Sequence, residues 1–191
     1  MVSTAQDSFP PDMNDRVSFH VMDCASPGMW NLPGLEGKEG SFDIVLAVWL
    51  LNYAANGEEL QRMLKNVQRA LKPGGKFVGL TTNVAAIDLW KENDLDIEGE
   101  KHLGSAYEMI ERVDEGWKGR FRGFAEPKIE FDFFFLREEV YAKAAEAAGL
   151  GKLEWKVVLP EKEEVDALVG DSHRLRDVTN VYRVGIIGSR I

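Results

Sequence analysis

Cysteine is almost absent from this sequence, in which Cys24 is the single cysteine among 191 residues. One cysteine excludes an internal disulfide framework and fits a reducing compartment, so we expect a cytoplasmic protein. Basic residues are also in deficit: 23 Lys and Arg stand against 32 Asp and Glu, for a formal net charge of -9. This sign disfavours nucleic acid as a partner, because that binding depends on neutralising phosphates.

Long apolar runs and metal-binding patterns are missing as well. No stretch approaches the roughly 20 apolar residues that a membrane span needs, and the N-terminus does not resemble a signal sequence. We therefore expect no membrane partner and interpret residues 1–16 as a flexible lead-in. The three histidines form no cluster with Cys24 or carboxylates at metal-ligand spacing, so no metal is expected.

Extended apolar segments and two helical patterns occupy the rest of the chain. Strands are predicted at Val17–Met22, Phe42–Trp49, Lys76–Thr82, Ile129–Phe135, Leu153–Leu159 and Asn180–Gly188. Helices are predicted at about Gly57–Leu71 and Arg137–Ala148. The first helix starts with capping-box spacing at Asn56 and Glu59, and it lies between two strands, as in the crossover units of parallel sheets. Residues 83–128 have no single period and are interpreted as an inserted cap, within one domain over residues 17–191.

Four short segments carry a family resemblance: Asp23 after a strand, FDIV at 42–45, LKPGG at 71–75 and AGL at 148–150. In this order they resemble class I S-adenosylmethionine-dependent methyltransferases. The most specific part is the pair FDIVLAVWLLNYA and ALKPGGKFVGL at their mutual spacing. The resemblance implies a Rossmann-like α/β sheet of strand order 3-2-1-4-5-7-6, with the last strand antiparallel.

The N-terminal part of that template has no counterpart here. Val17–Met22 corresponds to strand 3, while strands 1 and 2, whose turn carries a G-x-G pattern in the family, are absent. We therefore expect an N-terminally truncated domain, which is either a fragment or shortened product of a longer enzyme or a standalone variant that has lost the loop. In both cases the open sheet edge favours a homodimer, and Val17–Met22 is expected to move beside Phe42–Trp49 or to dock poorly.

The resemblance also implies a cofactor site for S-adenosylmethionine. Asp23 matches the residue that binds the adenine amino group, and Cys24 matches the residue that offers its backbone to the ring. Ala47, Val48 and Trp49 match the segment around the methionine and ribose, where a Trp ring could attract the sulfonium cation. From the residues alone, Asp23 could instead cap nearby amides, Cys24 could be a small buried residue, and Trp49 could pack in the core.

Candidate substrate and proton-transfer residues come from the same comparison and from the cap. The proposed substrate-binding residues are Asn52, Tyr53, Trp90, Trp117 and Arg122, and the candidate catalytic bases are His102 and Tyr107. The cap aromatics either line an apolar pocket or pack the insert against the sheet. We predict S-adenosylmethionine-dependent methyl transfer to a small molecule. The missing glycine-rich loop is the feature that could abolish this activity. The alternative is a non-catalytic module that pairs through its open edge. A nicotinamide-dependent dehydrogenase would need a glycine-rich first turn, which this sequence lacks.

Overall fold

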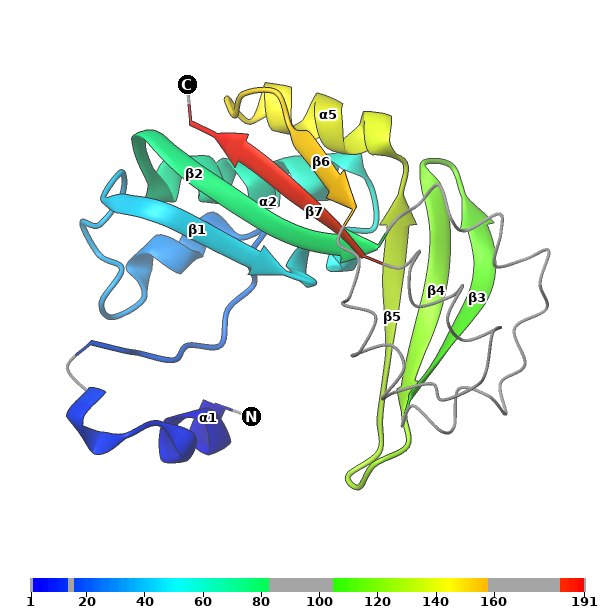
Figure 1. Ribbon diagram of the computed structural model, residues 1–191, viewed down its shortest axis with the longest axis horizontal. Coiled ribbons are helices and arrows are strands. Elements are labelled where there is room, and N and C mark those ends of the chain that lie inside the picture. Colours follow the sequence, from blue (N-terminus) through cyan, green and yellow to red (C-terminus); the bar gives the residue numbers. More distant parts are fainter. Residues whose placement is uncertain (1, 14–15, 83–104, 158–182, 191) are drawn as a thin grey trace.

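The computed structural model describes residues 2–13, 16–82, 105–157 and 183–190 (Figure 1). Its elements are α1 (Val2–Ser8), η1 (Pro11–Met13), η2 (Pro27–Asn31), β1 (Phe42–Val48), η3 (Leu50–Tyr53), α2 (Gly57–Ala70), β2 (Leu71–Thr82), β3 (Ser105–Val113), β4 (Gly116–Gly123), β5 (Ile129–Leu136), α5 (Glu138–Ala147), β6 (Glu154–Val157) and β7 (Arg183–Ser189). Within these ranges no helix is long and apolar enough to cross a membrane.

The larger sheet has the strand order β1-β2-β7-β6. β1 and β2 are parallel and are joined through α2, whereas β7 is antiparallel to both β2 and β6. This is the 4-5-7-6 part of the expected order, and the antiparallel last strand is confirmed. The irregular first part of β2 depends on glycine, because Gly74 has a φ of 75° and a Cβ on Gly75 would lie 2.9 Å from the carbonyl oxygen of Lys72.

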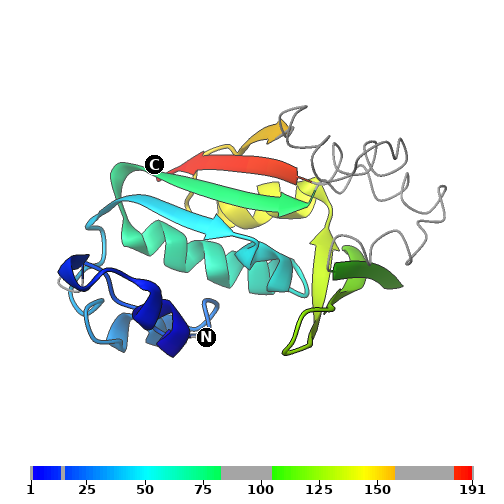
Figure 2. The ribbon, with the colours of Figure 1, turned by 60° about the horizontal axis from the view of Figure 1, so that its bottom comes forward.

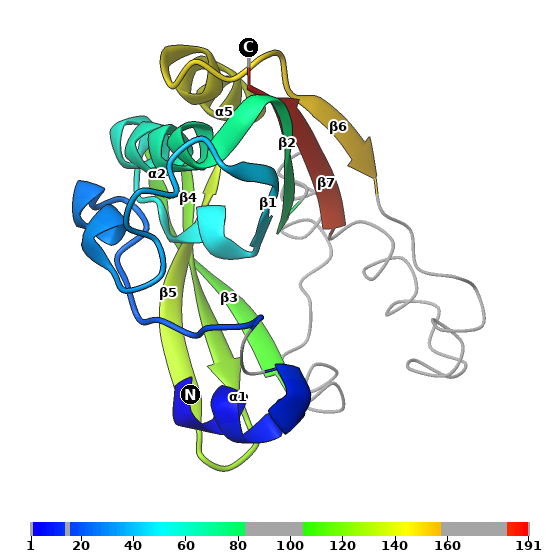
Figure 3. The same ribbon diagram turned by 90° about the vertical axis from the view of Figure 1, so that its left-hand side faces the viewer.

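Both long helices cover the same face of this sheet, as Figures 2 and 3 show from two directions. The predicted cap of α2 is present: Asn56 Oδ1 accepts from the Glu59 N–H at 2.9 Å, and Glu59 Oε2 accepts from the Ala55 N–H at 2.9 Å. Apolar residues of α2 and α5 are buried together with β1 and β2, including Leu60, Leu64, Phe77 and Tyr141. The predicted helical periods therefore identified the core-facing sides of both helices.

A second sheet, of order β3-β4-β5, is entirely antiparallel. Its third strand is the predicted strand at Ile129–Phe135, which lies outside the cap expected at residues 83–128 and pairs with β4 of that segment. The register explains this pairing, since Phe131 lies opposite Phe121 and Phe135 lies opposite Trp117. Such cross-strand aromatic pairs stabilise the pairing of β4 with β5. The sequence pattern of β5 alone does not identify β4 as its neighbour.

The predicted strand at Val17–Met22 is wrong, because this segment is in no strand. Val21 is 83% exposed, and the nearest polar contact of His20 is with the Ser18 hydroxyl, at 3.1 Å. Alternating residues favour a strand only where a neighbour completes the ladder and one face is buried. Here neither condition holds. In the preceding residues, predicted as a lead-in, α1 buries none of its side chains.

Candidate functional site

The carboxyl ends of the parallel strands β1 and β2 meet at one edge of the larger sheet, where β1 ends in a strained turn. Trp49 follows β1 with a φ of 60°, in the left-handed region that bulky residues seldom adopt. Its N–H donates to the Leu80 carbonyl of β2 at 2.9 Å, and the residue is 36% exposed. The turn therefore ends the strand beside its neighbour and leaves the indole partly open to solvent.

A buried polar network fixes the segment η3 that follows this turn. Thr81 Oγ1 donates to Asn52 Oδ1 at 2.9 Å, and the Tyr141 hydroxyl lies 3.3 Å from Thr81 Oγ1. Since the threonine proton is used toward Asn52, the tyrosine is the donor of the second bond. Asn52 Nδ2 also donates to the Phe134 carbonyl of β5 at 3.5 Å. Asn52, predicted to bind substrate, is therefore buried and joins the two sheets.

Tyr53 extends from η3 toward the second sheet. Its ring stacks at a tilt on Phe131, with centroids 5.6 Å apart, and Phe131 stacks on Phe121 at 4.9 Å. We call Tyr53, Phe131 and Phe121 the aromatic row. Tyr53 is 47% exposed and the other two are half-buried, so the row presents ring surface beside the end of β1. Such surface suits a planar or apolar group.

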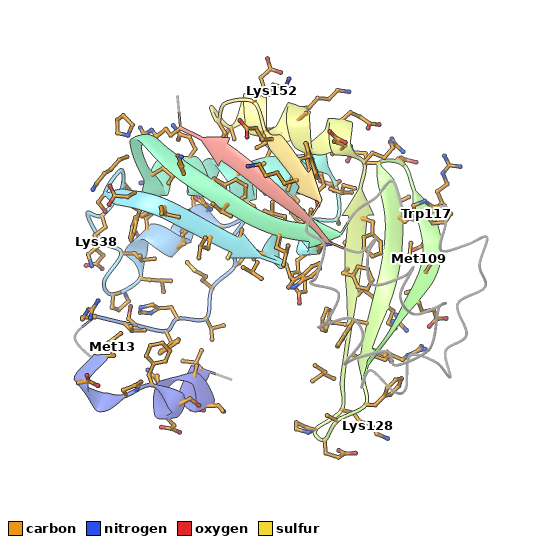
Figure 4. The ribbon with its side chains drawn as sticks, viewed as in Figure 1. Met13, Lys38, Met109, Trp117, Lys128 and Lys152 are labelled. Carbon is orange, nitrogen blue, oxygen red and sulfur yellow. The ribbon has the colours of Figure 1, made fainter. Side chains whose placement is uncertain are left out.

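Trp117 and Met109 lie on neighbouring strands of the second sheet (Figure 4). Trp117 and Phe121 lie four residues apart on β4 and therefore share one face of the sheet. Arg122 is the next residue after Phe121, so its guanidinium is on the opposite face. There Arg122 pairs with Glu108 at 2.7 Å and with Glu130 at 2.8 Å. The hydrogen bond with Glu130 raises the pKa of Arg122. The structure thus does not bring Arg122 together with the aromatic row, and its role in substrate binding stays a prediction.

Asp23 and Cys24 lie in a turn that contacts α2, where Asn66 Nδ2 donates to the Cys24 carbonyl at 2.9 Å. The Ala25 N–H donates to Asp23 Oδ1 at 2.8 Å, and the second carboxylate oxygen has no partner among the described residues. Asp23 is exposed, whereas Ala25 is 6% exposed and belongs to the core. Burial, and then the charge of Asp23, raises the pKa of the half-buried Cys24 thiol. The carboxylate caps a local amide and can still accept a bond from a ligand.

The remaining predicted residues divide into three groups. Ala47 is 1% exposed and packs in the core, while Val48 is 60% exposed on the opposite face of β1. Tyr107 pairs with Phe121 in the ladder between β3 and β4. Trp90 and His102 lie outside the described residues.

Sequence reasoning missed two buried polar residues. Thr81 bonds to Asn52 and Tyr141, and Asn66 bonds to the turn that contains Cys24. Thr81 is 1% exposed, and Asn66 is 8% exposed within the apolar pattern of α2. That interruption of an apolar helix face by an amide was the available signal for Asn66. Thr81 had none, because threonine is common in strands.

The donor set of the described residues fits an organic cation better than a metal. Across residues 2–13, 16–82, 105–157 and 183–190, no group of three or more His, Cys, Asp or Glu side chains could hold a metal ion. Asp23 offers a carboxylate oxygen to an amino group, and the exposed indole of Trp49 offers a π face to a cation. These are the features that an adenosyl sulfonium would use.

The sequence is similar to those of known methyltransferases. A family model described as a methyltransferase domain matches residues 1–79. Over 97 residues, 51% of this chain, the sequence is 29% identical to the sterol 4-C-methyltransferase strm-1 of Caenorhabditis elegans, of which it covers 24%. Over 108 residues, 56% of this chain, it is 38% identical to the mRNA cap guanine-N(7) methyltransferase of Aspergillus niger, of which it covers 17%. The chain thus spans about a quarter or less of the length of these curated relatives.

A solved structure gives the same result for the fold. An S-adenosylmethionine-dependent methyltransferase from Mesorhizobium loti superposes with a TM-score of 0.58 at 16% identity, over 100% of this chain and 76% of that one. At this identity the likeness concerns the fold alone. Residues 1–79 are thus similar in sequence to a methyltransferase domain, and the chain shares the α/β fold of an S-adenosylmethionine-dependent methyltransferase.

Proposed function

We propose that the protein transfers a methyl group from S-adenosylmethionine to a small-molecule acceptor. The observation that carries this proposal is the position of Trp49, which directly follows β1 with a partly exposed side chain and precedes η3, whose Tyr53 begins the aromatic row. In open α/β sheets, ligands bind outside the carboxyl ends of parallel strands, where Trp49 and Tyr53 lie. A cytoplasmic setting remains part of the proposal and rests on the single cysteine.

The residues present would divide the work of binding. Asp23 would accept the adenine amino group, and the ring of Trp49 would lie over the sulfonium. S-adenosylmethionine held there would provide an electrophilic methyl group for in-line displacement, with its sulfur as the leaving group. Such a displacement depends above all on proximity and orientation. The aromatic row would hold a flat acceptor, and Tyr107 or His102 would take its proton in the scheme predicted from the sequence.

Trp49→Ala is expected to weaken S-adenosylmethionine binding about tenfold, because a cation loses the π face that stabilises it. Isothermal titration calorimetry of the purified protein measures this change. Trp49→Phe is the matched control: it keeps an aromatic face and is expected to lose about threefold or less. Equal affinities for Trp49→Ala and the parent protein would remove the sulfonium role. A parent protein that binds no S-adenosylmethionine would overturn the proposed function.

The second candidate is an interaction module that pairs through β1, and it rests on a different observation. Ile44, Leu46 and Val48 are 59%, 66% and 60% exposed on the face of β1 that points away from α2 and α5. β1 is also the edge of its sheet among the described strands. An edge strand with exposed aliphatic side chains favours pairing with another chain, and we propose a second copy as that partner.

Leu46→Lys is expected to shift a dimer to monomer, since a charge at the centre of the paired edge cannot be buried without a partner. Sedimentation velocity at two protein concentrations measures the shift. Ile110→Lys is the control, because Ile110 is an exposed apolar residue of β3 at 40% exposure, away from β1. A parent protein that sediments as a monomer at high concentration would contradict the interaction module while leaving the methyltransferase proposal intact.

A further inference from the structure

Asn66 occupies a buried position on α2 that its neighbours fill with apolar side chains. It is 8% exposed, and Met63, Val67 and Ala70 on the same helix are each 6% exposed. A carboxamide in such a place costs free energy unless its donors and its acceptor are paired. The partners of Asn66 are therefore informative about what this residue does.

Among the described residues, the partners of Asn66 belong to one loop. Its Nδ2 donates to the Cys24 carbonyl and to the Ser26 carbonyl, both at 2.9 Å, while its Oδ1 accepts from Trp30 Nε1 at 3.3 Å. The residues contacted run from the turn that starts at Asp23 to Trp30, near the end of η2. One side chain thus attaches this loop to the helix that lies under the sheet.

The bond to Cys24 has a consequence for Asp23. The Cys24 carbonyl and the Ala25 N–H belong to the same planar trans peptide, so they point in opposite directions. With the carbonyl held at Asn66, the Ala25 N–H is directed away from α2, where it donates to Asp23 Oδ1 at 2.8 Å. The orientation of the Asp23 carboxylate is in this way set by the amide of Asn66, through one intervening peptide.

We propose that Asn66 is a positioning residue of the cofactor site, which holds the Asp23 carboxylate in the orientation that receives the adenosine part of S-adenosylmethionine. This inference rests on the proposed function for its ligand, but the positioning itself concerns the protein alone. The amide acts through the loop and does not touch the ligand. Its replacement therefore changes the loop in the free protein as well as the affinity.

Asn66→Asp is the most informative change, because it keeps the shape and the acceptor for Trp30 but replaces both amide donors with an oxygen that repels the two carbonyls. Asn66→Ala removes the amide altogether and serves if the aspartate variant does not fold. Gln61→Ala is the matched control, since Gln61 is an amide of the same helix that donates to the Ala147 carbonyl of α5 rather than to the loop. Each variant is compared with the parent protein.

Cys24 is the only cysteine, so its rate of reaction with a thiol reagent such as dithionitrobenzoate reports on this loop alone. We expect Asn66→Asp to accelerate the reaction about fivefold or more and to weaken S-adenosylmethionine binding about tenfold, with Gln61→Ala unchanged in both. In an Asp23→Ala background, Asn66→Asp is expected to cause no further loss of affinity, because the effect passes through Asp23. A residue that only stabilised the fold would weaken binding equally in both backgrounds.

Each outcome decides a separate point. Unchanged labelling of Cys24 in both Asn66 variants would overturn the positioning role. Faster labelling with unchanged affinity, or additive losses with Asp23→Ala, would overturn the link to the cofactor. If the parent protein binds no S-adenosylmethionine, the proposed function and the link to the cofactor both fail, and the labelling rates still decide whether Asn66 positions the loop.

Discussion

Replacing Tyr141 with alanine is expected to lower the free energy of unfolding by about 3–5 kcal/mol, the cost typical of removing a buried aromatic ring. Tyr141 is fully buried on α5, and its ring packs edge-on against Trp155 with centroids 5.4 Å apart. The loss of its hydroxyl also removes the bond to Thr81, which holds Asn52. Urea denaturation followed by circular dichroism measures the change.

Tyr141→Phe separates the ring from the hydroxyl and is expected to cost about 1 kcal/mol, the net value of one hydrogen bond. Burial raises the pKa of Tyr141 to about 12 from 10.0. Above pH 10 the unfolded state therefore loses this proton first, so the stability falls as the pH rises toward 12. This part of the alkaline loss should be absent in Tyr141→Phe. Equal destabilisation by phenylalanine and alanine would contradict the packing role.

Replacing Gly116 with alanine is expected to disrupt the pairing of β4 with β5 at a cost of about 3 kcal/mol or more, because the added methyl group has no room. A Cβ at this position would overlap the carbonyl oxygen of Phe135 and lie 2.8 Å from its carbonyl carbon. Both atoms belong to the backbone of the partner strand, so relief requires the two strands to separate. Thermal unfolding of the purified variant measures the loss.

Gly123→Ala is the control for this change, at the other end of the same strand. There the added Cβ would lie 2.7 Å from Cγ1 of Ile129, a side chain that is 52% exposed and can rotate away. Its cost should be about 1 kcal/mol. A loss for Gly116→Ala no greater than that for Gly123→Ala would show that the ladder tolerates the strain. Because β5 carries Phe131 of the aromatic row, Gly116→Ala is also expected to disorder that row.

Much of the larger sheet could be predicted because its signals are local. The cap at Asn56, the helical period of α2 and the glycines after Pro73 act within a few residues, and each is visible in the sequence. The strand predicted at Val17–Met22 failed for the opposite reason. A strand exists only through a neighbour, and alternation cannot tell whether one is present.

In the candidate site, too, local sequence signals were informative and contacts between distant residues were not predictable. The resemblance nominated Trp49 and Tyr53, and the structure places both beside the end of β1, although the stacking of Tyr53 on Phe131 joins residues far apart in the chain. Asn52 was nominated for substrate and is instead buried between the sheets. An amide has the same appearance in a sequence whether it faces a ligand or a carbonyl, so only its surroundings could decide.

The sequence by itself determined the resemblance to methyltransferases, the parallel unit of β1, α2 and β2, and the low number of cysteines and basic residues, because these follow from composition and from contacts within a short stretch of chain. The tertiary structure alone decided that β5 pairs with the cap, that Arg122 faces away from the aromatic row, and that Asn66 holds the loop of Asp23. The physical reason is that register, facing and buried hydrogen bonds join residues distant in sequence. The energy of each such contact depends on the residue that folding brings beside it, and a local sequence pattern does not identify that residue.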